Sequence, residues 1–220
     1  MSNTFVRTLV TAVLAAAVSV GTLFAASALW PALRNPWVLI IVGAVALILG
    51  IIAGILGSYD LTTPSGWLLL LVDNSWALPS TLLGAVVGNI VYPFFGSPST
   101  SQSAGQDWVS YKARGSSGFG VDVLQTLGTV NIGGSGNHER VHLLQARILG
   151  PLFLVIVGIS YVVLFLFQCV WSITIGLILR LTKVRDTAWF RAPAKSAVPG
   201  FWGWIYFATP MELWAYATEP

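Results

Sequence analysis

The sequence predicts a mainly α-helical integral membrane protein, because its composition is strongly apolar and its apolar residues fall in long runs. Hydrophobic residues make up 55% of the 220 residues and charged residues only 9%, whereas a soluble domain carries about a quarter charged residues. The mean hydropathy is +0.78. We therefore expect the lipid bilayer to be the main partner of the chain. The net charge of +3 is too small and too scattered to favour nucleic acid.

Residues 1–57 predict a transmembrane helical hairpin. Residues 5–30 are apolar apart from Arg7 and a few Ser and Thr, and residues 37–57 form a second run of the ~20 residues needed to cross a bilayer. The first run is longer than the core of a signal peptide, so we expect it to be retained as a helix. Four glycines in the second run permit close helix contact: Gly43, Gly50, Gly54 and Gly57. We assign residues 58–220 to a second, membrane-associated domain.

The start of the second domain leaves two interpretations open. Residues 67–95 are apolar but contain Asp73 and Asn74, which are costly inside a membrane unless they have a polar partner. Alternatively, residues 67–72 form a short interfacial helix, 73–80 a polar turn and 80–92 a second helix, and we favour this version. Residues 96–117 are rich in Ser, Gly, Pro and Gln, and predict a surface loop.

The rest of the chain predicts a short β element followed by helices. Residues 119–132 alternate as a small hairpin or an edge strand would, and Ser135 or Asn137 is placed to cap the next helix. Residues 151–181 are long enough to cross a bilayer once. The basic residues after them are typical of a cytoplasmic flank: Arg180, Lys183, Arg185, Arg191 and Lys195. Residues 201–217 are aromatic, too short to span, and expected at the membrane interface.

The most informative motif is the segment from His138 to His142, which spells His-Glu-x-x-His. Residues four apart share one face of a helix, so both imidazoles can bind one Zn²⁺, while Glu139 serves as general base towards water. Gln145 falls on the same face and is expected to support the site by a hydrogen bond. Arg140 and Arg147 fall on other faces, where we expect them to meet lipid headgroups. The alternative is that the two histidines stack without a metal.

A catalytic zinc usually has three protein ligands and one open position, so a third ligand is needed. The acidic candidates are Asp73, Asp107, Asp122, Glu212 and Glu219. Glu212 is the best of them, because an isolated carboxylate in an aromatic, apolar segment needs a strong partner. Its alternative position is in solvent at the membrane surface.

Four motifs follow one another in the second domain. They are Ser-Trp-Ala-Leu-Pro-Ser-Thr-Leu-Leu-Gly (75–84), Thr-Leu-Gly-Thr-Val (126–130), His-Glu-x-x-His-x-x-Gln with Gly-Pro (138–151) and Pro-x-Glu-x-x-Ala (210–215). Together they resemble an uncharacterised family of zincin-like domains, found as small bacterial membrane proteins and as terminal domains of polymorphic toxins. The resemblance implies a zincin-like α domain, with Glu212 as the third metal ligand. It implies no particular substrate.

The membrane topology constrains this site. If residues 151–181 cross the bilayer once as a straight helix, His138 and Glu212 lie on opposite faces, unless the C-terminal segment re-enters deeply. A bend near residues 158–160, or an oblique course of the helix, would keep both on one side. The basic residues would then make that side cytoplasmic, and we favour this arrangement.

The resulting hypothesis is a membrane-embedded, zinc-dependent hydrolase of the gluzincin type, peptidase-like, in the bacterial cytoplasmic membrane. His138, His142 and Glu212 would hold Zn²⁺, and Glu139 would activate water. The alternative is a non-catalytic accessory subunit that packs against other subunits of a larger membrane complex. A transporter is a poorer third hypothesis, since no inverted repeat is visible.

Overall fold

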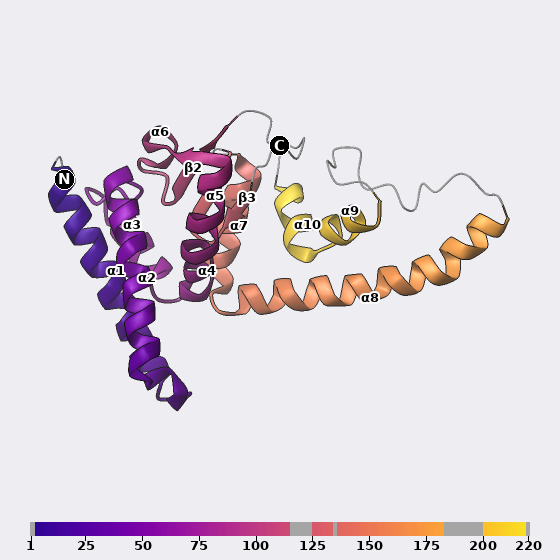
Figure 1. Ribbon diagram of the computed structural model, residues 1–220, viewed down its shortest axis with the longest axis horizontal. Coiled ribbons are helices and arrows are strands. Elements are labelled where there is room, and N and C mark those ends of the chain that lie inside the picture. Colours follow the sequence, from indigo (N-terminus) through magenta and orange to yellow (C-terminus); the bar gives the residue numbers. More distant parts are fainter. Residues whose placement is uncertain (1–2, 115–124, 134–135, 183–199, 219–220) are drawn as a thin grey trace. The chain divides into compact units, whose positions relative to one another are not determined.

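The computed structural model describes residues 3–114, 125–133, 136–182 and 200–218, and divides into two compact units, Met1–Pro151 and Leu152–Pro220. Helices dominate both, and the first unit also contains a small four-stranded sheet (Figure 1). Within the described residues, four helices are long and apolar enough to cross a membrane: Thr4–Ala26, Pro36–Leu56, Leu78–Phe95 and Leu152–Thr174. The fold class predicted from the composition, a mainly helical membrane protein, is therefore confirmed.

The N-terminal hairpin consists of α1 (Thr4–Ala26) and α2 (Pro36–Leu56), joined by the 3₁₀ turn η1 (Pro31–Arg34). The two helices lie side by side (Figure 1). The side chain of Asn35 accepts a hydrogen bond from the first turn of α2, which satisfies one of the backbone donors left over at a helix start. The predicted hairpin is confirmed.

Two of the predicted contact glycines allow the hairpin to close tightly. A Cβ atom added at Gly50 would lie 2.7 Å from the Cα of Ala12, and one added at Gly54 would lie 2.5 Å from the Cα of Thr8. Any larger residue would push the helices apart. Arg7 then ties the ends together, because its Nε donates to the carbonyl oxygen of Gly54 at 2.9 Å.

The segment after the hairpin is broken into short helices. They are α3 (Pro64–Asp73), α4 (Leu78–Leu83), the π-helical stretch η2 (Gly84–Gly88) and α5 (Asn89–Phe95). The break falls at residues 74–77, as the favoured interpretation of a helix, a polar turn and a second helix predicted. Asp73 is nevertheless fully buried. The other interpretation, that this carboxylate needs a polar partner, therefore applies as well.

A mixed sheet in the order β1-β2-β4-β3 follows. Its strands are β1 (Gly96–Pro98), β2 (Val109–Ala113), β3 (Gln125–Leu127) and β4 (Val130–Ile132), and the short helix α6 (Thr100–Ser103) lies between the first two. β3 and β4 pair antiparallel, which confirms the predicted hairpin in its described part. β2 pairs parallel to β4 and antiparallel to β1.

The prediction of a surface loop over residues 96–117 is wrong, because this segment supplies half of the sheet. Three of its serines misled the prediction, since Ser99, Ser103 and Ser110 are buried and hydrogen-bonded rather than solvated. The Ser103 hydroxyl accepts from the backbone N–H of Ser110 at 2.9 Å, and the Ser110 hydroxyl donates to Asn131 on β4 at 3.1 Å. Val109 and Tyr111 join the apolar core of the unit beside Val130 and Ile132.

Helix α7 (Asn137–Leu149) carries the histidine motif. It is preceded by Gly136 in an extended conformation, and no side chain caps it. The prediction that Asn137 caps this helix is therefore wrong: Asn137 is its first residue. Ser135, the other predicted cap, lies outside the described residues.

The second unit contains α8 (Leu152–Leu181), α9 (Gly200–Phe207) and α10 (Pro210–Ala217). α8 is one continuous helix, so the predicted bend near residues 158–160 is wrong. A single glycine lowers helix propensity by only about 1 kcal/mol, and the apolar neighbours of Gly158 sustain the helix. The basic cluster after α8 lies outside the described residues, apart from the backbone of Arg180.

Within this unit the chain returns along α8. Phe165 contacts Phe201 at a ring-centroid distance of 5.9 Å, and Phe167 stacks on Trp204 at 5.5 Å. α10 follows and also contacts α8. The C-terminal helices therefore run from the middle of α8 back towards its first half.

Candidate metal centre

Helix α7 brings the two histidines together on one face. The Nε2 atoms of His138 and His142 lie 3.1 Å apart, and the rings meet edge to face with centroids 4.7 Å apart. Both side chains are half-buried. The predicted pairing of the two imidazoles is thus present in the structure.

Gln145 contacts the ring of His142 at Nδ1, the nitrogen that does not face His138. The Oε1 atom of Gln145 lies 2.9 Å from Nδ1 of His142, and the Gln145 side chain is fully buried. Because a carbonyl oxygen only accepts, this contact places the imidazole proton on Nδ1. The lone pair of His142 is then on Nε2, the atom that faces His138. Gln145 therefore contacts His142 on the same face of α7, and its role in orienting a metal ligand stays a prediction.

The separation of the two Nε2 atoms is close to that of two nitrogens that bind one metal ion. Two nitrogens bound to one tetrahedral zinc at ~2.0–2.1 Å lie about 3.3 Å apart. The observed 3.1 Å differs from this by only a few tenths of an ångström. Without a cation, one of the two nitrogens must instead carry a proton to hydrogen-bond the other. The spacing is therefore compatible with two imidazoles that share one metal ion.

Glu139, the predicted general base, is buried with 4% of its surface exposed, and its Oε2 atom has no hydrogen-bond partner among the described residues. A buried carboxylate without partners is costly, so this oxygen is suited to receive a proton or a hydrogen bond from a bound molecule. The hydroxyl of Tyr92 on α5 is also buried without a described partner and lies within electrostatic range of Glu139. Sequence reasoning missed Tyr92, because no spacing rule marks a lone tyrosine 46 residues before the motif.

The acidic candidates for the third ligand differ in their burial and in their hydrogen-bond partners. Asp122 and Glu219 lie outside the described residues, and both carboxylate oxygens of Asp73 are engaged elsewhere. Burial raises the pKa of Asp107, although the charge of Arg147 opposes this. Glu212, in the first turn of α10, is buried. His138, His142 and Glu212 together form a group that could hold a metal ion.

A charged cluster is built around Asp73 at the end of α3. It includes Arg147 from α7, the helix that carries the histidines. Arg147 forms a two-pronged ion pair with Asp73, with Nε donating to Oδ1 at 2.8 Å and Nη2 to Oδ2 at 2.7 Å. The Tyr59 hydroxyl also donates to Oδ2, at 2.7 Å, and Nη2 of Arg147 reaches the carbonyl oxygen of Asp107 at 3.1 Å. The prediction that Arg147 meets lipid headgroups is therefore wrong. Arg140, by contrast, is exposed and lies over the ring of Trp108.

The electrostatics of this cluster favour the ionised pair. Burial lowers the pKa of Arg147, but the hydrogen bond and charge of Asp73 outweigh it, so the pKa lies above its usual value. Burial foremost, and then the negative charge of Asp73, raise the pKa of Tyr59 well above its usual value. The sequence did contain a clue, since a carboxylate in an apolar segment requires a cation. It did not identify which cation.

No family model, no curated protein and no solved structure matches this chain. The class of protein therefore rests on the chain itself: an integral membrane protein with a possible metal site formed by two histidines and a glutamate.

Proposed function

We propose that this protein is a membrane-embedded, zinc-dependent hydrolase of the gluzincin type that acts on peptide-like substrates. In this proposal His138, His142 and Glu212 hold the zinc, Glu139 is the general base, and Gln145 orients His142. When bound, zinc supplies Lewis acidity and lowers the pKa of water. The particular substrate is left open.

The observation that carries the proposal is the arrangement of the imidazole pair. Two Nε2 atoms lie 3.1 Å apart, one of them with its tautomer set by a buried glutamine. A stacked pair without a metal would need a proton between the two Nε2 atoms, and it would not need the buried amide. Side chains that orient a metal-binding histidine through its second nitrogen are a regular feature of zinc sites.

The path of the C-terminal helices supports Glu212 as the third ligand. A straight, membrane-crossing α8 would separate Glu212 from the histidines if the chain ended beyond its far end. Instead, Glu212 lies within electrostatic range of Tyr161 on α8. Tyr161 is nine residues after Leu152, or about 14 Å along the helix at 1.5 Å per residue. The chain thus brings Glu212 back towards the start of α8, which directly follows α7.

The remaining groups divide the chemistry between them. Glu139 takes a proton from water as it attacks a carbonyl carbon, and returns it to the leaving amine. Its buried, unpartnered oxygen is suited to both steps, since no competing hydrogen bond has to be broken. The Tyr92 hydroxyl is available to donate a hydrogen bond to a substrate oxygen.

The test is the zinc content of the purified, detergent-solubilised protein, measured by mass spectrometry beside four variants. We expect about one zinc per wild-type chain, and its loss in His142→Ala and Glu212→Ala. Glu139→Gln should retain zinc, and it should lose cleavage of a peptide library that the wild type cleaves. Asp107→Asn is the matched control, because it neutralises a candidate carboxylate that the proposal does not use, and it should keep the metal.

Each result bears on a separate part of the proposal. Zinc retained in Glu212→Ala would remove Glu212 from the ligand set. Absence of zinc from the wild type after reconstitution would overturn the hydrolase proposal and favour a non-catalytic subunit. Circular dichroism of each variant shows whether the helices persist, so that loss of metal is not confused with loss of fold.

A further inference from the structure

The second unit contains a pocket away from the histidine motif. Helix α8 exposes most of its described side chains, as a lipid-facing helix does, but Gln168 is an exception with only 2% of its surface exposed. Among the described side chains of α8, Gln168 alone is buried. A polar residue thus occupies the one enclosed position on an apolar helix, which is the reverse of what packing alone would select.

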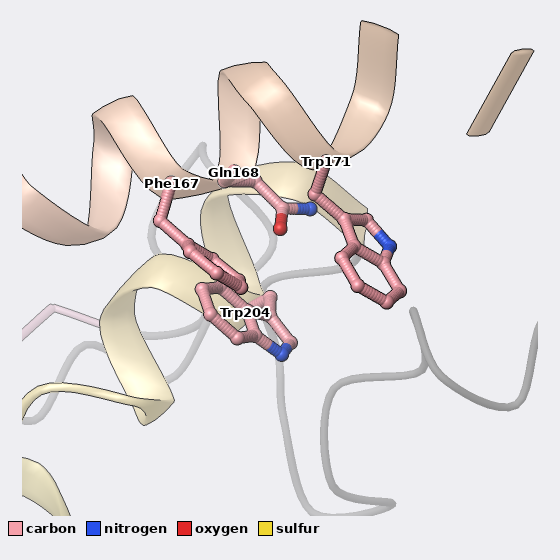
Figure 2. A pocket seen from close by; sticks show the side chains of 4 residues that line it. All are labelled: Phe167, Gln168, Trp171 and Trp204. Atoms are coloured by element: carbon pink, nitrogen blue, oxygen red, sulfur yellow. The ribbon is translucent and has the colours of Figure 1, made fainter. Parts of the chain in front are cut away.

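Gln168 lies in the wall of a cavity of about 150 Å³ lined by Phe167, Trp171 and Trp204. Figure 2 shows its carboxamide directed between the Trp171 ring on one side and the Phe167–Trp204 pair on the other. The three rings are close to parallel: Phe167 is inclined by 22° to Trp171 and by 20° to Trp204. The described lining of the pocket therefore combines flat aromatic walls with one carboxamide.

The carboxamide forms no hydrogen bond with the described part of the chain. Gln168 belongs to the apolar segment Leu152–Thr174, which is long enough to cross a membrane, and lies about 24 Å from its first residue. In a helix that spans a bilayer, the surrounding lipid supplies no bulk water to replace a missing partner, so an unsatisfied amide is costly. The amide is therefore available to a polar atom of a molecule that enters the pocket.

We propose that this pocket binds a flat, lipid-soluble ring bearing a carbonyl group, the chemical class to which alkyl-substituted quinones belong. The ring lies against the aromatic walls, where stacking adds to the gain from burying its surface. The carbonyl oxygen accepts a hydrogen bond from the amide nitrogen of Gln168. A cavity of about this volume holds one six-membered aromatic ring in another protein, and the alkyl chain of such a ligand remains in the lipid.

The lining argues against ligands of other types. Among the described residues, no charged side chain lines this pocket, so an ionic headgroup would enter without a described counter-charge at a large desolvation cost. A hydrocarbon chain would fill the space but leave the amide unsatisfied.

The experiment compares two probes that differ in the carbonyl groups. The probes are a benzoquinone with a decyl chain and decylbenzene, each measured as the amount retained by protein-containing lipid nanodiscs beyond empty ones. The wild type should bind the quinone about tenfold more tightly than decylbenzene, the value of one net hydrogen bond. In Gln168→Leu the two probes should bind equally. Trp204→Leu should weaken both.

A matched control is available on the same helix as Trp204. Trp202→Leu removes an exposed tryptophan of α9 that does not line the pocket, and it should bind both probes as the wild type does. Equal binding of the two probes to the wild type would overturn the proposal, as would a quinone preference that survives in Gln168→Leu. None of these readouts involves zinc, so the proposal stands or falls separately from the hydrolase.

Discussion

Removing Arg147 should destabilise the protein more than removing its partner Asp73. The Asp73 side chain is completely buried, whereas 12% of the Arg147 side chain is exposed. Without Arg147, the carboxylate keeps only the hydrogen bond from Tyr59 and has no route to solvent. Without the carboxylate, the long arginine side chain can extend its charged end outward.

The expected magnitudes follow from this asymmetry. Breaking a buried ion pair by removing one partner costs about 3–5 kcal/mol. We place Arg147→Met near the upper end of that range and Asp73→Asn near the lower end. The double variant Asp73→Leu/Arg147→Met leaves no buried charge at the pair, and should recover to within about 2 kcal/mol of the wild type.

The assay is unfolding in detergent followed by circular dichroism, with zinc content measured on the same samples. Arg140→Met is the matched control, because Arg140 is an exposed arginine on the same helix whose contact with Trp108 contributes only about 0.5–1 kcal/mol. If Arg147→Met changed stability by no more than this control, the pair would not be buried as described. A double variant no more stable than Arg147→Met would show that lost packing, rather than uncompensated charge, sets the cost.

Two further predictions concern the same unit. Because the pKa of Tyr59 is raised in the folded state, the unfolded chain releases this proton first as the pH rises above about 10. Stability should then fall by about 1.4 kcal/mol per pH unit for this group, and Tyr59→Phe should make the decline shallower in alkaline unfolding titrations; an unchanged slope would contradict the assignment. A Cβ atom at Gly84 would collide with the carbonyl oxygen of Leu127, so Gly84→Ala should cost about 1–3 kcal/mol. Gly21→Ala has open space around it and should be neutral or stabilising by up to about 1 kcal/mol; equal melting temperatures for the two variants would refute the close approach at Gly84.

Sequence reasoning succeeded where a local pattern has one structural solution. Apolar runs of about 20 residues have to be helices in a bilayer, which gave α1, α2 and α8. The spacing of His138, His142 and Gln145 fixes one helix face whatever surrounds it. The part of the candidate site within α7 was therefore predictable without knowledge of the tertiary structure.

The errors arose where distant segments determine the outcome. β2 exists because β1 and β4 flank it, and the alternative of a solvated loop has the same polar composition. Arg147 pairs with a residue 74 positions away, so nothing near it in the sequence distinguishes a buried arginine from one at the surface. The predicted bend in α8 came from a topological requirement of the proposed metal site rather than from a local sequence signal, and the single Gly158 does not interrupt the helix.

The distance in sequence between Asp73 and Arg147 has a consequence for synthesis in the cell. At about 5–20 residues per second, the ribosome needs about 4–15 s to make the 74 residues that separate them. During this interval the carboxylate has no cation to neutralise it, and lipid would be an unfavourable place for it. The segment around α3 should therefore wait at the membrane surface, and settle only when α7 has been made. The N-terminal hairpin, which needs no such partner, can insert first and mark where the later helices assemble.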